Sequence, residues 1–183
     1  MSVTRYIAFL RVINVGGHTV KMDALRAIFE SLGFSEVETF IASGNVIFET
    51  QSNAPHLLEG RIEKILKEEL GYEVATFIRT DAELTAIAQY KPFKKSQMDT
   101  AVALNVALLA DPLDAASKNK LMTLKTNIDD FHAYAREIYW LCRKKQSKST
   151  FSNVLLEKTL GRKATLRGIN TLRKLAEKYP HTD

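Results

Sequence analysis

The chain has 183 residues, of which 45% are hydrophobic and 26% charged, values that are typical of a soluble globular protein and exclude intrinsic disorder. No apolar run approaches the roughly 20 residues that span a bilayer, and the first residues lack the pattern of a secretory signal. We therefore expect a cytoplasmic protein without a membrane partner. A single cysteine, Cys142, excludes an internal disulfide, and with only four histidines we expect no metal and no cofactor.

The net charge of +5 is unevenly distributed along the chain. Residues 136–183 contain 12 Lys and Arg and 4 acidic residues, whereas residues 1–135 contain 14 basic and 17 acidic residues. A basic segment on a mildly acidic body is typical of proteins that bind a polyanion or a small anionic ligand. A solvated pair of basic helices would give the same asymmetry, so both interpretations stay open.

The first half of the chain alternates between the sequence periods of strands and helices. Short β-rich runs predict strands, apolar residues three and four apart predict helices, and glycines mark the helix ends. In chain order we expect a strand over 6–12, a helix over 22–32, strands over 37–42 and 46–49, a helix over 55–70 and a strand over 74–78. This β-α-β-β-α-β order is that of a ferredoxin-like unit, in which two helices cover one face of an antiparallel sheet.

The same order recurs in the second half. A capping box, Thr80 to Glu83, predicts a helix to about residue 90, and the segment 91–95 interrupts the pattern as a joint. After it we expect a strand over 102–108, a helix that begins after residue 112 and runs to about 124, strands over 131–135 and 138–142, a helix over 151–160, an extended piece over 163–166 and a helix over 169–178.

These elements predict an α+β protein of two pseudo-repeated lobes with antiparallel-rich sheets and a C-terminal helical segment. We place an N-terminal ferredoxin-like lobe at 1–90 and a C-terminal α+β lobe with a basic helical end at 96–183, and we expect the two to form one compact body.

The stretch from Asn14 to Gly17 lies where the first predicted strand leads into the first helix. Glycines there allow the backbone to approach a ligand, and a helix N-terminus presents free N–H groups to an anion, with Lys21 adding a positive charge. The stretch lacks the Gly-Lys-Ser/Thr of a Walker A loop and the third glycine of a dinucleotide fingerprint. A long turn required by geometry alone is the alternative.

Three further segments are candidate ligand sites: the hairpin turn at 43–45, the serine-rich run at 147–149 and the helix entrance at 167–171. The hairpin is explained equally well by turn geometry, the serines by a linker in which Ser149 or Thr150 caps a helix, and Arg167 by an internal ion pair. Our candidate ligand-binding residues are Arg11, Asn14, Gly16, Gly17, Lys21, Ser43, Asn45, Ser147, Lys148, Ser149, Arg167, Asn170 and Thr171.

The remaining polar and aromatic residues add little chemistry. His18 and His132 have no partner at a metal-ligand or triad spacing, and we find no convincing nucleophile–base pair. The pattern therefore disfavours an enzyme and assigns no catalytic residue. Tyr134, Tyr139 and Trp140 are expected to pack in the core. Only if they faced outward beside basic residues would they resemble a platform for single-stranded nucleic acid.

The quoted residues carry a resemblance to a known family, the bacterial domain-of-unknown-function family 1697. It implies an α+β fold with two lobes and supplies no activity. Two departures are Val12, where the family usually has Gly, and Gly168, where it usually has Asn. The matching positions are LRVINVGG with Met22 and Leu25-Arg26, then Leu32-Gly33-Phe34, Phe40 to Asn45, Ser147-Lys148-Ser149, Leu156-Glu157, Leu160-Gly161, Thr165, Arg167 and Asn170-Thr171.

From the sequence we favour a binding module for a phosphorylated or otherwise anionic small ligand, held in a cleft between the lobes where the three loop-to-helix junctions converge. The first alternative is a nucleic-acid-binding protein that uses the basic C-terminal quarter. The second is an enzyme that acts on a phosphorylated substrate.

Overall fold

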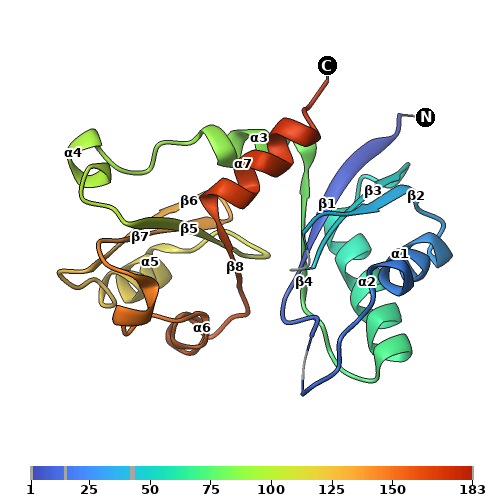
Figure 1. Ribbon diagram of the computed structural model, residues 1–183, viewed down its shortest axis with the longest axis horizontal. Coiled ribbons are helices and arrows are strands. Elements are labelled where there is room, and N and C mark those ends of the chain that lie inside the picture. The colour runs from blue at the N-terminus through green and yellow to red at the C-terminus, as the bar shows by residue number, and fades with distance from the viewer. Residues whose placement is uncertain (1, 15, 42–43, 183) are drawn as a thin grey trace. The chain divides into compact units, whose positions relative to one another are not determined.

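The computed structural model describes residues 2–14, 16–41 and 44–182. The chain divides into two compact units, a first unit of residues 1–85 and 175–183 and a second unit of residues 86–174. Each unit is built around one four-stranded sheet (Figure 1).

The first unit has the predicted β-α-β-β-α-β order. Its antiparallel sheet has the strand order β2-β3-β1-β4, so the first strand of the chain lies at the centre. The elements are β1 (Thr4–Leu10), α1 (Met22–Ser31), β2 (Ser35–Thr39), β3 (Asn45–Thr50), α2 (Pro55–Leu70) and β4 (Thr76–Thr80), after which α3 (Asp81–Gln89) follows directly.

Helices α1 and α2 lie on the same side of this sheet (Figure 1) and bury its apolar face. The core is rich in aromatic rings: Phe29 of α1 packs edge-on against Phe48 of β3, and Phe34 stacks on Phe48 with 4.4 Å between ring centroids. The sequence signals for helix ends are confirmed. Gly71 has φ of 82° and donates its N–H to the Lys67 carbonyl, which closes α2.

The second unit repeats this topology with the strand order β6-β7-β5-β8, which confirms the predicted pseudo-repeat. Helices α5 and α6 lie together on one side of the sheet (Figure 1). The elements are α4 (Lys95–Met98), β5 (Ala103–Leu108), α5 (Ala115–Met122), β6 (Asp129–Tyr134), β7 (Glu137–Cys142), the 3-10 turn η1 (Gln146–Lys148), α6 (Asn153–Leu160), β8 (Thr165–Gly168) and α7 (Ile169–Lys178).

The start of α6 corrects the sequence-based expectation. Neither Ser149 nor Thr150 caps this helix; its N-cap is Ser152, whose Oγ accepts the Leu155 N–H at 3.1 Å. The reason is tertiary. The ring of Phe151 packs against Trp140 in the core, 4.5 Å between centroids, which holds the preceding residues in an extended conformation.

The end of α7 belongs to the first unit, where the residues at its C-terminus contact β2. The Tyr179 hydroxyl donates to Glu38 Oε2 at 2.5 Å, and Lys178 Nζ lies 3.3 Å from the same oxygen. The hydrogen bond from Tyr179, followed by the contact with Lys178, lowers the pKa of Glu38 below its ordinary value of 4.5. One lysine of the basic C-terminal segment is thus used in the structure itself.

We expect Tyr179→Phe to lower the free energy of unfolding at pH 7 by about 0.5 kcal/mol, because Glu38 is half exposed and solvent weakens the interaction. The folded-state pKa of Glu38 is depressed, so its contribution is present above the unfolded-state pKa and is lost as the pH falls through the folded-state pKa. Denaturant titrations of both proteins at pH 7 and pH 3 measure this, and a deficit of the same size at both values would contradict it.

Candidate functional site

The loop that joins β1 to α1 is held by one of its own side chains and by a tyrosine that follows α2. Asn14 Oδ1 accepts the Val20 N–H at 2.9 Å, and the Tyr72 hydroxyl donates to the Ile13 carbonyl. Gly16 and Gly17 both have left-handed φ angles, 57° and 81°, which only glycine adopts without strain. The loop is therefore a shaped structure, and Asn14 is engaged in maintaining it.

The start of this loop is fixed to the strand edge. Arg11 donates its backbone N–H to the Ala75 carbonyl at 2.8 Å, just before β4 begins. At its other end, Lys21 immediately precedes the first turn of α1.

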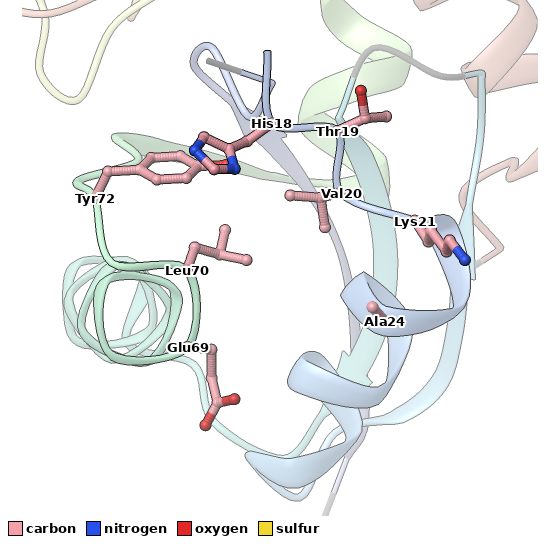
Figure 2. A pocket seen from close by; sticks show the side chains of 8 residues that line it. All are labelled: His18, Thr19, Val20, Lys21, Ala24, Glu69, Leu70 and Tyr72. Atoms are coloured by element: carbon pink, nitrogen blue, oxygen red, sulfur yellow. The ribbon is translucent and has the colours of Figure 1, made fainter. Parts of the chain in front are cut away.

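A pocket of about 360 Å³ lies between the loop, the first turn of α1 and the last turn of α2. Figure 2 shows the side chains of Val20 and Leu70 in its centre, with the rings of His18 and Tyr72 along one side. Its volume is at the lower end of the range of small-molecule sites. The lining residues are His18, Thr19, Val20, Lys21, Ala24, Glu69, Leu70 and Tyr72.

The charged groups of the pocket have opposite signs. Lys21 stands at the positive end of α1, and Glu69 lies in the last turn of α2, at its negative end. Both side chains are exposed, and neither they nor His18 form an ion pair or side-chain hydrogen bond with any residue that the structure describes. The pocket thus has a cationic side, an anionic side and an apolar centre.

The hairpin between β2 and β3 has a structural role in the residues that can be described. Asn45 is buried, and its Nδ2 donates to the Phe40 carbonyl at 3.0 Å. Gly44 accepts the Leu10 N–H at 2.9 Å. Ser43, the other candidate of this turn, lies outside the described residues.

The candidate run at 147–149 divides into two kinds of residue. Ser149 Oγ contacts both carboxylate oxygens of Asp129, at 2.9 and 2.8 Å, so its hydroxyl is held within the fold. Ser147 and Lys148 are exposed in the turn before it. Asp129 is 1% exposed and also accepts from Trp140 Nε1 at 2.8 Å.

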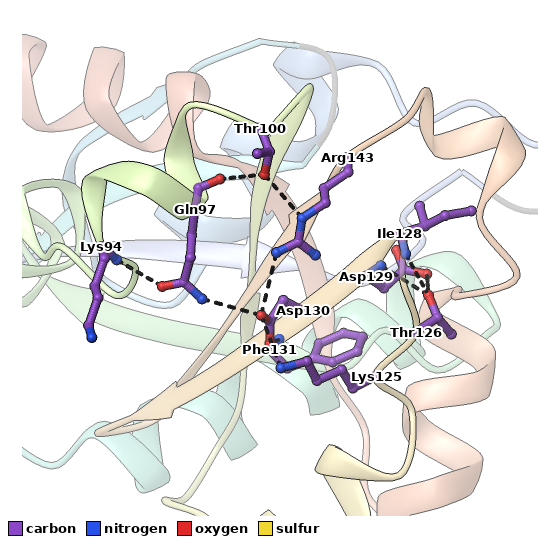
Figure 3. Close-up of polar contacts among 10 residues, drawn as sticks. All are labelled: Lys94, Gln97, Thr100, Lys125, Thr126, Ile128, Asp129, Asp130, Phe131 and Arg143. Atoms are coloured by element: carbon purple, nitrogen blue, oxygen red, sulfur yellow. Dashed lines mark hydrogen bonds and ion pairs between the residues drawn. The ribbon is translucent and has the colours of Figure 1, made fainter.

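Two basic side chains contact the neighbouring Asp130 at the start of β6 (Figure 3). Its Oδ2 lies 3.4 Å from Lys125 Nζ and 3.7 Å from Arg143 Nη2. Gln97 of α4 donates to the same oxygen at 3.4 Å, and Arg143 Nε donates to Thr100 Oγ1 at 3.0 Å. The segment that follows β7 is in this way tied to β6 and to the chain around α4.

Arg167 lies on β8 and is 8% exposed. Its Nη1 donates to Thr165 Oγ1 at 2.8 Å and to the Leu166 carbonyl at 2.9 Å. Burial lowers the pKa of its guanidinium to about 10, so the group stays charged at neutral pH. Asn170 and Thr171 follow within the first turn of α7, where no side-chain hydrogen bond engages either one in the described structure.

The structure brings some of these candidates together and keeps others apart. Arg11, Asn14, the two loop glycines and Lys21 share one loop of the first unit. In the second unit, Ser149 contacts β6 on the sheet face that carries Trp140, whereas Arg167 lies on β8, at the opposite edge and on the other face. Three strand spacings separate those edges by about 14 Å.

The sheet therefore does not bring Ser149 and Arg167 together. The expected convergence of segments from different lobes on one cleft stays a prediction.

Sequence reasoning missed several residues of interest. Glu69, Leu70 and Tyr72 line the pocket from the end of α2, a position that only the folded chain reveals. Arg79, on β4, is 1% exposed and donates from Nη1 to the Ile78 carbonyl, as Arg167 does to Leu166. A signal was available in the sequence, because Ala-Thr is followed by two apolar residues and Arg along β4 and by one apolar residue and Arg along β8.

The cysteine and the described metal-ligating side chains offer little further chemistry. Burial raises the pKa of the Cys142 thiol, whose Sγ donates to the Lys144 carbonyl at 3.0 Å, so this cysteine is poorly suited to act as a nucleophile. Across the described residues, no group of three or more His, Cys, Asp or Glu side chains is placed to hold a metal ion. The helices in the same residues are too short or too polar to cross a membrane.

The repeated topology and the closed β1–α1 loop define a class: an α+β protein made of two ferredoxin-like units. The chain belongs to the family described as Protein of unknown function (DUF1697), which matches residues 3–139. The C-terminal positions of the resemblance, from Ser147 onward, lie beyond the matched residues.

Among solved structures, the chain is similar to the conserved bacterial protein SP0830 from Streptococcus pneumoniae, with a TM-score of 0.76 and 22% sequence identity. The superposition covers 96% of this chain and 98% of that chain. At this identity the likeness shows the fold alone. No curated protein matches the chain.

Proposed function

We propose that the protein is a binding module for a small organic anion, which is held in the pocket beside the β1–α1 loop. The observation that carries the proposal is the pocket itself, with His18 beside Tyr72, Lys21 at the start of α1 and Val20 and Leu70 in its centre; neither Lys21 nor His18 is paired with a side chain in the described part of the chain. An exposed lysine at the start of a helix stabilises a phosphate or carboxylate through charge and directed N–H groups.

The other lining residues of the pocket restrict the kind of ligand that fits. Glu69 repels a ligand that is negative along its whole length, whereas the apolar centre and the Tyr72 ring favour an uncharged body. The best match is a compact anionic group attached to an apolar or aromatic body, such as a nucleoside monophosphate or an aryl phosphate.

We expect adenosine monophosphate or phenyl phosphate to raise the melting temperature of the protein, because a ligand that binds only the folded state stabilises it. Lys21→Gln should weaken that binding about tenfold, the loss of one charge-assisted contact. Calorimetric titration at 50 and 200 mM salt measures both affinities.

The matched control is Lys64→Gln, which removes an exposed lysine of α2 that does not line the pocket. Equal affinities for the parent protein and Lys21→Gln, or equal losses for the two variants, would argue against this pocket as the site. If glucose 6-phosphate bound as tightly as phenyl phosphate, the pocket would still be an anion site, but its apolar centre would not contribute to the affinity.

A further inference from the structure

A cluster of aromatic side chains lies along β6, the edge strand of the second sheet. Residues 130, 132 and 134 alternate onto one face of the strand. The ring of Tyr134 stacks on Tyr90 with 4.2 Å between centroids and 10° between planes, and the Tyr90 hydroxyl is 2.8 Å from His132 Nε2. We call Tyr90, His132 and Tyr134 the aromatic cluster.

Tyr134 is the outward member of this cluster. Its side chain is 55% exposed, unlike Tyr139 and Trp140 on the neighbouring strand, which are buried. The expectation of core packing is thus met by two of the three hairpin aromatics and not by Tyr134. Its ring is held in place by the stack on Tyr90, so little side-chain freedom remains to be lost when a planar group binds.

Cations gather at the other end of the same strand. Lys125 and Arg143 approach Asp130, and the segment after β7 adds three exposed lysines that pair with no carboxylate in the described chain. This basic cluster consists of Lys125, Arg143, Lys144, Lys145 and Lys148.

The segment that carries most of the basic cluster is held to β6 and its neighbouring chain by contacts at both ends. Arg143 contacts Asp130 on the face of β6 that carries Tyr134, and Ser149 contacts Asp129 on the opposite face, so the segment between them passes around the end of this edge strand. Asp130 and Tyr134 are four residue steps apart along β6, about 13 Å at 3.3 Å per step. That length corresponds to about four stacked nucleotides at 3.4 Å each.

We propose that the β6 edge of the second unit binds single-stranded nucleic acid, with a base stacked on Tyr134 and the phosphates at the basic cluster. Cations beside an exposed, prepositioned ring are the combination that single strands require. An acidic protein segment would use the cations and leave the ring without a partner. A duplex hides the base faces from Tyr134. The proposal uses no residue of the loop pocket and goes beyond the function proposed above.

The test is fluorescence anisotropy of the full chain with a labelled twelve-nucleotide oligothymidylate. We expect binding at 50 mM salt that weakens steeply at 200 mM. Tyr134→Ala should weaken it roughly 5- to 100-fold, the range for loss of one base stack, and Tyr134→Phe should retain it. The double variant Lys145→Gln/Lys148→Gln should make the log–log salt dependence shallower by about 1.4.

The control is Lys118→Gln/Lys158→Gln, which removes two exposed lysines from α5 and α6 and should leave the affinity unchanged. No binding at 50 mM salt, or the same loss in the control, overturns the proposal. It is also overturned if the matched duplex or polyglutamate binds as tightly as the single strand, or if Tyr134→Ala binds normally with native circular dichroism.

Discussion

Replacing Asp129 with alanine is expected to lower the free energy of unfolding by about 3 kcal/mol. This carboxylate is 1% exposed and accepts from Trp140 Nε1, from the Ser149 hydroxyl and, at 3.2 Å, from Thr126 Oγ1. Alanine would leave the buried indole N–H and at least one hydroxyl without a partner. Each such orphaned group costs about 1–3 kcal/mol.

The single tryptophan makes this effect directly observable. Because Trp140 donates to Asp129 and the chain has no other tryptophan, its fluorescence reports unfolding of the second unit at the site of the change. Denaturant titration followed at this fluorophore gives the free energy. Asp129→Asn should cost less than alanine, since the amide oxygen still accepts one of the hydrogen bonds.

Asp99→Asn is the matched control, because Asp99 is an exposed carboxylate whose side chain pairs, among the residues that the structure describes, only with Lys95 on the surface. Its effect should stay within about 0.5 kcal/mol. If Asp129→Ala were as mild as this control, the three hydrogen bonds to this carboxylate would contribute little to the stability of the second unit.

The fold was predictable because its signals are local. Pro55 at the first turn of α2 and Gly71 after its last turn lie within a few residues of the boundaries they set. The capping box formed by Thr80 and Glu83 is present as the sequence indicates, with reciprocal bonds of 2.9 and 3.1 Å. Repetition of these signals in the same order was enough to predict two units of one topology.

The candidate sites were less predictable because their chemistry depends on distant partners. Ser149 was expected to bind a ligand or to cap a helix, and its actual partner, Asp129, is 20 residues earlier, on β6. The short helix α4 was also missed, because four residues carry too little periodicity to be recognised. Exposure of Tyr134 is likewise set by its place at a sheet edge, which no sequence period reports.

Gly44→Ala is expected to lower the free energy of unfolding by about 3 kcal/mol, through two separable effects. Gly44 has φ of 80°, a conformation that costs a side-chain-bearing residue about 1–2 kcal/mol. A Cβ at this position would also lie 3.2 Å from Ile13 Cγ2 and 3.2 Å from Leu10 Cβ. Both neighbours are buried, so they yield little room, and overpacking adds about 1–2 kcal/mol.

Gly17→Ala separates the two effects, because Gly17 has nearly the same φ, 81°, and no atom lies within 4 Å of the position its Cβ would take. We expect this variant to lose only the backbone part, about 1 kcal/mol. Chemical denaturation followed by circular dichroism compares the two proteins. Equal losses would mean that Leu10 and Ile13 move aside freely, and that the β2–β3 hairpin is packed against the start of the β1–α1 loop less tightly than the contact distances indicate.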